Sequence, residues 1–209
     1  MIKLLKIAEP EIVEIHGEQW TEDFVALKAA GGTDAKVESR HRHAAIKTAL
    51  FVETNDKCAY CEEKIRSSQH GDVEHIDPKS LHPDRYLVWE NLTIACAICN
   101  NKKRDHTGLI NPYVDEPDQH LAWCGPLVSP SPGSFMGSLT VRCLGLNRTE
   151  LLLKRSAKIA AIMNLFELMD REVDDAVKQV ILEDIMSKCE KTEEFSAASY
   201  HYIEFRERL

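Results

Sequence analysis

Hydrophobic and polar positions divide the first half of the chain into a helical segment and a broken, turn-rich segment. From Thr33 to Glu53, apolar residues recur at broadly helical spacing without proline or glycine. This pattern predicts an amphipathic helix after the Gly31–Gly32 break. Between residues 58 and 105, short apolar runs alternate with turn residues. That pattern favours a hairpin followed by one short helix.

The second half combines a turn-rich stretch with long helical patterns. Residues 111–147 carry most of the prolines, and strand-like pieces at 121–128 and 138–146 flank a turn-rich sequence, which predicts a small β-hairpin. Asn147, with Glu150 three residues later, resembles a helix capping box, so we expect a long helix to begin there. Helical patterning continues through the remaining residues. Together these elements predict an α+β fold.

Composition and charge set limits on what the chain can bind. Its 209 residues, 44% of them hydrophobic and 29% charged, suffice for one core, or for a core and a small second module. No apolar run is long enough for a membrane helix, and acidic residues interrupt the first apolar run before a signal peptide can form. We therefore expect a soluble, cytoplasmic protein with no membrane partner. The formal net charge of -8 means that any grip on DNA must be local or supplied by a partner.

Four of the seven cysteines form two C-x-x-C pairs, Cys58/Cys61 and Cys96/Cys99. Each pair presents two thiolates from one tight turn, and two pairs complete a tetrahedral zinc site. In a reducing cytosol we interpret them as metal ligands, with redox-active or core cysteines as the alternative. Sites closed by four thiolates are structural, so we expect a zinc ion that supports folding rather than catalysis.

The 34 residues between the two cysteine pairs contain an adjacent acidic residue and histidine, Glu74 and His75. Apolar neighbours favour a strand here, and adjacent residues on a strand face opposite sides. Pro78 favours a bend that would bring both side chains to one site. Glu74 then offers a hard oxygen ligand to Mg²⁺ or Mn²⁺, while neutral His75 can take a proton from water.

The residues after the second cysteine pair extend this predicted site. Asn100 follows that pair directly, so the metal-binding turn would position its amide oxygen as a second ligand; Asn101 would replace it if the helix began one residue later. Residues 102–104 form the only basic run in the region. We expect Lys103 and Arg104 to contact phosphate oxygens of the substrate.

In this order the residues resemble the HNH, or ββα-metal, nuclease family. The shared elements are C-x-x-C, then acidic-His-Ile-x-Pro, then Asn-Leu, then C-x-x-C-Asn-x-x-Lys. The resemblance implies that Glu74 is the first metal ligand and His75 the general base. It also implies that Asn91 holds the loop and orients His75, and that Asn100 is the last metal ligand. Lys103 matches the basic position of the family.

The resemblance implies a zinc-stapled ββα-metal core with flanking α-helices and a small β-hairpin. Two departures from the usual pattern are Glu at the acidic position, where Asp is commoner, and Asn at the last metal position, where many members have His. We expect an N-terminal helical segment at 1–54, the HNH core at 55–112 and a region at 113–209 that docks on a partner or on a second copy.

A closer resemblance covers roughly residues 40–155. The stretches KCAYCEEKI, VEHIDPKS, WENL, CNNKK and LGLNRTELLLKR are similar to the HNH subunit of Septu-type and retron-associated antiphage systems. That subunit works with an ABC or SMC-like ATPase. The resemblance therefore implies an antiviral defence nuclease that acts on DNA together with such a partner.

Three functions are weighed against one another: a metal-dependent endonuclease, a zinc-bearing nucleic-acid-binding module and a catalytically silent adaptor. The intact set of acidic, histidine and asparagine positions favours the first, and the negative net charge argues against the second. The other histidines considered are expected to be solvated or hydrogen-bonded rather than metal ligands. They are His41, His43, His70, His82, His106 and His120.

Overall fold

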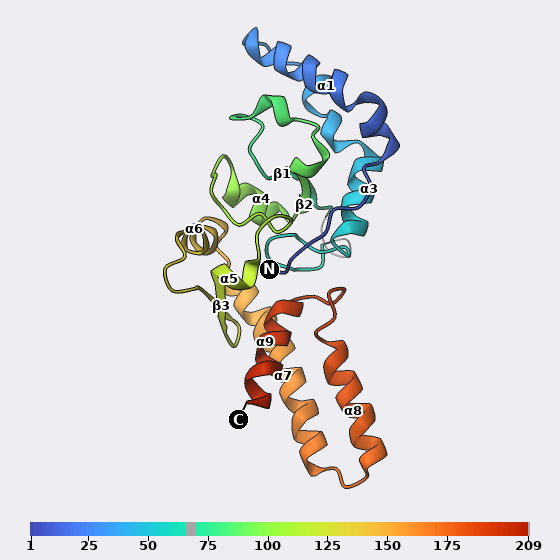
Figure 1. The fold of residues 1–209 in the computed structure, drawn as a ribbon, viewed down its shortest axis with the longest axis vertical. Coiled ribbons are helices and arrows are strands. Elements are labelled where there is room, and N and C mark those ends of the chain that lie inside the picture. The colour runs from blue at the N-terminus through green and yellow to red at the C-terminus, as the bar shows by residue number, and fades with distance from the viewer. Residues whose placement is uncertain (66–69, 209) are drawn as a thin grey trace.

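The structure is a computed structural model that describes residues 1–65 and 70–208. Its helices are α1 (Glu11–Ala29), α2 (Ala35–Glu38), α3 (Ala44–Glu53), α4 (Ala97–Lys103), α5 (Pro117–His120), α6 (Phe135–Leu144), α7 (Thr149–Arg171), α8 (Asp175–Ser187) and α9 (Ser196–Glu207), with 3-10 turns η1 (Arg40–Arg42), η2 (Pro83–Arg85) and η3 (Trp89–Asn91). The molecule is elongated, with α1 at one end and the α7–α8 hairpin at the other (Figure 1).

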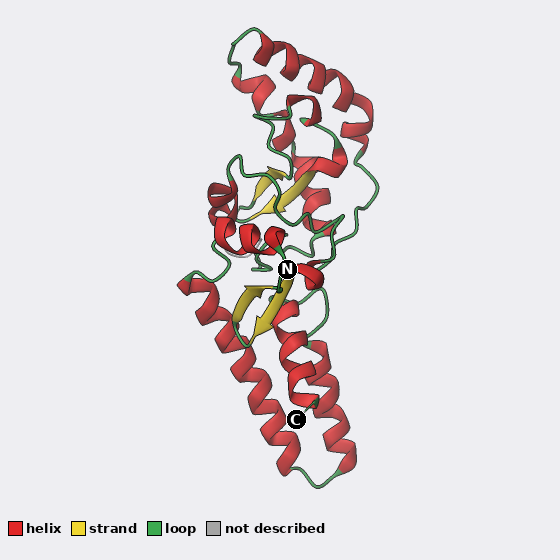
Figure 2. Cartoon of the chain, turned by 60° about the vertical axis from the view of Figure 1, so that its left-hand side comes forward, coloured by secondary structure: helices red, strands yellow, loops and turns green. Residues whose placement is uncertain are grey.

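The centre of the molecule is a ββα unit. Strands β1 (Asp72–His75) and β2 (Leu92–Ala95) pair antiparallel, with His75 opposite Leu92, and α4 follows directly. Helices α3 and α4 both pack against this sheet. A second antiparallel pair, β3 (Leu121–Cys124) and β4 (Leu127–Pro130), lies between the ββα unit and the long C-terminal helices (Figure 2). The predicted α+β fold, with its central unit, flanking helices and small hairpin, is confirmed.

One hydrophobic core joins segments that are far apart in the sequence. Ile46 and Leu50 of α3 contribute to it, as do Ile94 of β2, Leu144 of α6 and Phe195 just before α9. The main core therefore draws on all three of the regions predicted from the sequence, and it places α3 beside the ββα sheet.

A second, smaller cluster lies within the C-terminal helices, which we call the helical arm (α7–α9). It is formed by Ile162, Phe166, Ile181, Ile185 and Ile203. The helical pattern predicted for this part of the chain is confirmed. Because of this cluster, the arm has a core of its own beyond the ββα unit.

Among the described helices, none is both long and apolar enough to cross a lipid bilayer.

The helix predicted from Thr33 to Glu53 is broken into α2, η1 and α3. Asp34 caps α2 by accepting from the backbone N–H of Lys36, and the ring of His43 caps α3 by accepting from the N–H of Ala45. Two helix starts within one periodic stretch explain the break, because each cap requires a non-helical backbone. As a result His41, in the connecting turn, is buried against the ββα unit.

The strand predicted at 138–146 is wrong, because these residues belong to α6. The hydroxyl of Ser134 accepts from the N–H of Gly137 at 2.9 Å, and Gly145 ends the helix with a φ of +58°. A Ser cap and a left-handed Gly are strong helix boundaries, and they override the apolar alternation between them. The second strand of the hairpin is instead β4, which follows β3 after a two-residue turn.

The capping box predicted at Asn147 is also wrong, although the long helix is present. Arg148 precedes the first turn of α7 and makes no side-chain cap. The side-chain amide of Asn147 instead accepts from the N–H of Val128 at 3.0 Å and donates to the C=O of Val128 at 2.7 Å. Asn147 therefore holds the β3–β4 hairpin against the base of the arm.

Gly71, which immediately precedes β1, is expected to tolerate no side chain. Its φ is +61°, and an added Cβ would lie 2.9 Å from Phe51 Cζ and 3.0 Å from Ile65 Cδ1. Gly31 has a similar φ of +65° but open space around it. We predict that Gly31→Ala costs about 1 kcal/mol of unfolding free energy from backbone strain, and that Gly71→Ala costs about 1–3 kcal/mol more from overpacking. Urea denaturation measures both, and equal losses would contradict the packing argument.

Candidate active site

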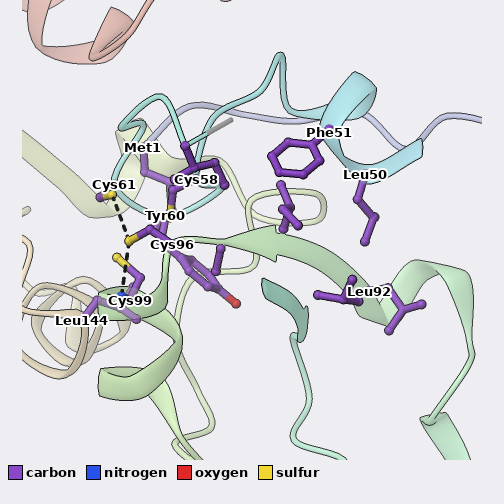
Figure 3. Packing of buried hydrophobic residues seen from close by; sticks show 14 of the residues in the cluster. Met1, Leu50, Phe51, Cys58, Tyr60, Cys61, Leu92, Cys96, Cys99 and Leu144 are labelled. Carbon is purple, nitrogen blue, oxygen red and sulfur yellow. Dashed lines mark hydrogen bonds between the residues drawn. The ribbon is translucent and has the colours of Figure 1, made fainter. Parts of the chain in front are cut away.

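The four predicted cysteine ligands converge on one point. The sulfurs of Cys58, Cys61, Cys96 and Cys99 lie within 4.8 Å of one another, and all four residues are buried. A tetrahedral zinc ion with Zn–S bonds of about 2.3 Å requires sulfurs about 3.8 Å apart. The sulfurs of Cys61 and Cys96 are 3.9 Å apart, and Figure 3 shows them facing each other beside Cys99. The donor set and its spacing therefore fit zinc.

The cysteine cluster fixes where α4 begins. The first pair is attached to β2, because the N–H of Ala59 donates to the C=O of Ile94 at 3.0 Å. Cys96 precedes α4, and its sulfur accepts from the N–H of Cys99. Asn100 is the next residue of that helix. A metal bound by the four sulfurs would thus hold the start of α4, and with it Asn100, at the end of the hairpin.

Arg148, at the base of the helical arm, contacts the sulfur cluster from outside. Its guanidinium lies 3.7 Å from the sulfurs of Cys99 and Cys61, 3.8 Å from that of Cys96 and 3.7 Å from a carboxylate oxygen of Glu63. Four thiolates on one divalent ion carry a net charge of -2, which a neighbouring guanidinium partly offsets. The cysteine motif carries no signal for this contact, since Arg148 lies well outside it.

A cavity of about 400 Å³ opens beside β1 and α4. It brings together three of the predicted site residues, Glu74, His75 and Asn100. The chain bends at residues 76–77, immediately after the strand, as the proline predicts. The bend follows the last residue of β1, and both Glu74 and His75 line the cavity. The full lining comprises His41, Arg42, Lys47, Gly71, Asp72, Val73, Glu74, His75, Lys79 and Asn100.

His75 is held as a neutral base. The residue is only 5% exposed, and its Nε2 lies 2.9 Å from the carbonyl oxygen of Tyr86. A carbonyl only accepts hydrogen bonds, so Nε2 carries the proton and Nδ1 keeps its lone pair. Burial, with a smaller contribution from the positive charge of Lys79, lowers the pKa of His75 to about 3, against the hydrogen bond to Tyr86. The imidazole is therefore unprotonated near neutral pH.

Asn91 does not line the cavity but closes the loop that holds His75. Its fully buried amide accepts from the N–H of Asp77 at 2.7 Å and donates to the carbonyls of Asp77 at 3.1 Å and Arg85 at 3.0 Å. Arg85 is followed by Tyr86, whose carbonyl binds the ring of His75. These contacts support the predicted orienting role of Asn91, which acts through the loop.

Lys103 is buried beneath β1 rather than exposed to substrate. It is 1% exposed, and its ammonium lies 2.8 Å from Glu74 Oε1 and 2.8 Å from the carbonyl oxygen of His75. Burial raises the pKa of Glu74, and the charge of Lys103 opposes that shift. The predicted phosphate contact does not fit this arrangement, because the ammonium is already satisfied within the fold. Arg104 is exposed outside the cavity, and its phosphate contact stays a prediction.

Oxygen donors gather on one side of the cavity. The side-chain nitrogen of Asn100 donates to Asp72 Oδ2 at 3.0 Å, which leaves the amide oxygen of Asn100 as its ligand atom. Asp72 and Glu74 are two apart on β1 and share a face, a signal that the sequence analysis missed. Asn101, the alternative ligand, is exposed and does not line the cavity. Carboxylate and amide oxygens are the donors that Mg²⁺ and Mn²⁺ prefer.

His41 is a buried residue of the cavity wall. It is hydrogen-bonded, as the sequence analysis expected for the histidines outside the motif. The hydroxyl of Tyr86 donates to the carbonyl of Val37 at 2.8 Å, so it accepts from His41 Nδ1–H at 3.0 Å. The other ring nitrogen, Nε2, then faces Lys79 Nζ at 3.5 Å. Burial is the main cause that lowers the pKa of His41 to about 2, and the neighbouring imidazole of His75 and ammonium of Lys79 also disfavour its protonation. Its place in the cavity was not predicted.

Comparisons with known proteins agree with this geometry. The model of the HNH endonuclease family matches residues 58–106. We refer to this matched segment as the HNH domain. The chain is 36% identical over 112 residues to Septu protein PtuB of Bacillus thuringiensis, an alignment that spans 51% of this chain and 43% of that protein. It is 24% identical over 247 residues to Septu protein PtuB of Bacillus mycoides (strain KBAB4), across 97% of this chain and 83% of that protein.

The resemblance to HNH nucleases and to Septu proteins, which the motifs indicate, is confirmed. The chain spans less than half the length of the first of these relatives. The HNH domain contains both cysteine pairs, Glu74, His75, Asn91 and Asn100. It begins after His41, Arg42 and Lys47, so the cavity is lined by residues from inside and outside the domain.

We predict that Arg148 slows the loss of zinc. Arg148→Met removes the guanidinium contacts to three sulfurs, so zinc should leave the site at least ~10-fold faster, in line with the effect of lost outer-shell partners. Release into a chromogenic chelator measures this rate on protein whose zinc content is first determined by mass spectrometry. Arg142→Met removes an exposed arginine of α6 and is the matched control. Equal release from both variants would refute the contribution of Arg148.

Proposed function

We propose that this chain is a metal-dependent HNH endonuclease that hydrolyses DNA phosphodiester bonds in antiphage defence. The observation that carries the proposal is one cavity lined both by a neutral His75, whose Nδ1 retains its lone pair, and by oxygen donors from β1 and α4. A base and a divalent-metal site within one cavity are the two components that metal-assisted hydrolysis requires. The similarity to Septu proteins supports the role in defence.

The proposed chemistry starts at His75. Its Nδ1 takes a proton from a water molecule, and that water attacks the phosphorus as the bond to the leaving oxygen breaks. The hydrogen bond from Nε2 to Tyr86 keeps the ring oriented and stabilises the positive charge that the ring acquires. Glu74 and Asn100 would hold Mg²⁺ or Mn²⁺, with Asp72 as a further donor. Such an ion supplies positive charge for the phosphate and leaving oxygens.

We assign zinc to the four-cysteine cluster as a structural ion. All four ligand positions are protein thiolates, which leaves no open position for a water or substrate. Two of the ligands, Cys96 and Cys99, lie at the first turn of α4, and a bound ion would act on the site by fixing that turn. Removal of zinc should therefore unfold the site, and not only abolish its activity.

We further propose that the helical arm docks on an ABC or SMC-like ATPase in the cytoplasm, or on a second copy of the chain. The arm exposes apolar side chains that a free surface helix does not need, among them Leu168 (53% exposed), Val173 (89%) and Val180 (65%). The net charge of -8 supports a partner that contributes to DNA binding. The relatives named Septu protein PtuB support a defence system as the source of that partner.

The nuclease proposal predicts that His75→Ala reduces DNA cutting by at least ~100-fold, because the general base is lost. Plasmid cleavage in Mg²⁺ or Mn²⁺ measures the effect, with EDTA as the test of metal dependence and with the ATPase and nucleotide present. His82→Ala, which removes an exposed histidine from the same loop, is the control and should cut normally. If wild type and His75→Ala were equally silent under all these conditions, the adaptor interpretation would replace this one.

The docking proposal predicts that charge on the outer face of α8 breaks the complex. Val177 and Val180, three residues apart on one exposed face, are both changed to Asp. Co-expression with the ATPase subunit followed by size-exclusion chromatography should show the ATPase eluting alone, while helical content measured by circular dichroism is unchanged. Lys178→Gln on the same helix should leave the complex intact. A variant chain that still co-elutes with the ATPase would count against this surface.

A further inference from the structure

Two chemically different sets of side chains line the cavity. Oxygen donors come from β1 and α4, while three cations come from other segments: Arg42 of η1, Lys47 of α3 and Lys79 of the turn after β1. Within residues 1–65 and 70–208, none of these three cations forms an ion pair with a carboxylate. Other lysines near the sheet are paired, as Lys6 is with Glu53. The cations facing the cavity therefore have no directly bound carboxylate, and Lys79 interacts with Glu38 and Glu74 only beyond ion-pair distance.

Two aromatic rings and an imidazole surround the ammonium of Lys79. Its ammonium lies 5.9 Å from the ring centre of Phe24 and 5.7 Å from that of Tyr86, and 3.5 Å from His41 Nε2. These contacts orient the side chain but do not neutralise it. Burial, together with the positive charge of Arg42, lowers the pKa of Lys79 to about 8, against the opposing effect of the Glu38 and Glu74 carboxylates. An anion in the cavity would relieve this cost, because a partly buried charge is stabilised by a partner.

We propose that Arg42, Lys47 and Lys79 form a phosphate-binding wall that holds the DNA backbone against His75. This inference rests on the proposed nuclease function and names the side chains that bind the substrate. Three cations in the same cavity as a cluster of oxygen donors suit a phosphodiester, on which negative charge develops during hydrolysis. The wall also takes the role that the sequence analysis gave to Lys103, whose ammonium is bound to Glu74.

The wall gives the N-terminal segment a function. The HNH domain begins at residue 58, so Arg42 and Lys47 lie outside it and are brought to the cavity by the packing of α3 on the sheet. The break between α2 and α3 places His41 where its Nε2 accepts from Lys79. His41 is therefore a positioning residue for the wall, and its other nitrogen binds the hydroxyl of Tyr86, whose carbonyl holds His75.

The test measures DNA binding in a His75→Ala background, where the substrate stays intact. A fluorescent DNA duplex of 20 base pairs is titrated with Arg42→Gln, Lys47→Gln and Lys79→Met at several KCl concentrations, by fluorescence anisotropy. Each variant should weaken binding several-fold and reduce the slope of log Kd against log salt by about 0.9, the value for one phosphate contact on duplex DNA. Lys36→Gln, which removes an exposed cation of α2 outside the cavity, should match the parent in both respects.

A second measurement separates binding from catalysis in the His75-containing protein. Arg42→Gln and Lys47→Gln should raise KM for DNA cleavage more than they lower kcat, since they hold phosphate in both ground and transition states. Urea midpoints equal to that of the parent show that each variant is folded. Affinity and salt slope unchanged in all three wall variants would overturn the wall, even if His75→Ala abolishes cutting. Conversely, weakened binding with no cutting by the parent chain would keep the wall and reject the nuclease.

Discussion

The convergence of four cysteine sulfurs is the constraint on which the rest of the site depends. The two C-x-x-C turns are 34 residues apart, and one ion can bind both only if the intervening chain returns to its starting point. The β1–β2 hairpin is that return, and it carries Glu74 and His75 on its first strand. Because Cys96 and Cys99 belong to the start of α4, an ion bound by the four sulfurs would also set the position of Asn100. Arg148 extends the constraint to the helical arm through its contacts with three of the sulfurs.

The charged and titratable side chains around the cavity differ in how their charge is compensated. Glu74 is neutralised from below by Lys103, which lets a carboxylate remain buried next to a base. His75 is kept neutral by burial and has one nitrogen occupied by a carbonyl, so a single lone pair is left to act. Lys79, by contrast, is oriented by aromatic rings and by an imidazole, none of which cancels its charge. Among the described residues, the cavity therefore combines an ion-paired carboxylate, a neutral base and cations that form no direct ion pair.

The sequence predicted the parts of this site that local spacing encodes. Two cysteine pairs, a strand ended by a proline and an asparagine after the last cysteine are short-range patterns, and the ββα unit follows from them. It did not predict His41 or Lys79 as neighbours, because their contact depends on how α3 packs against the sheet. Nor did it predict the burial of Lys103, since a basic residue at a helix end is usually solvated. The errors at α6 and Asn147 have the same origin, in that caps and tertiary contacts outweighed apolar periodicity.

The negative net charge argues against a nucleic-acid binder, but it does not describe the charge inside the cavity, where three cations lie. Acidic residues outnumber basic ones, 34 to 26, and one groove beside α1 is lined by six carboxylates, those of Glu9, Glu14, Glu18, Glu22, Asp84 and Glu90. Such a surface repels a phosphate backbone, whereas three unpaired cations in the cavity attract it. For the proposed nuclease, this distribution favours contact with the DNA backbone where the base and the metal ligands lie and disfavours nonspecific contact elsewhere. On this proposal, electrostatics concentrates DNA binding at the catalytic cavity, and the proposed partner would provide the contacts to longer DNA.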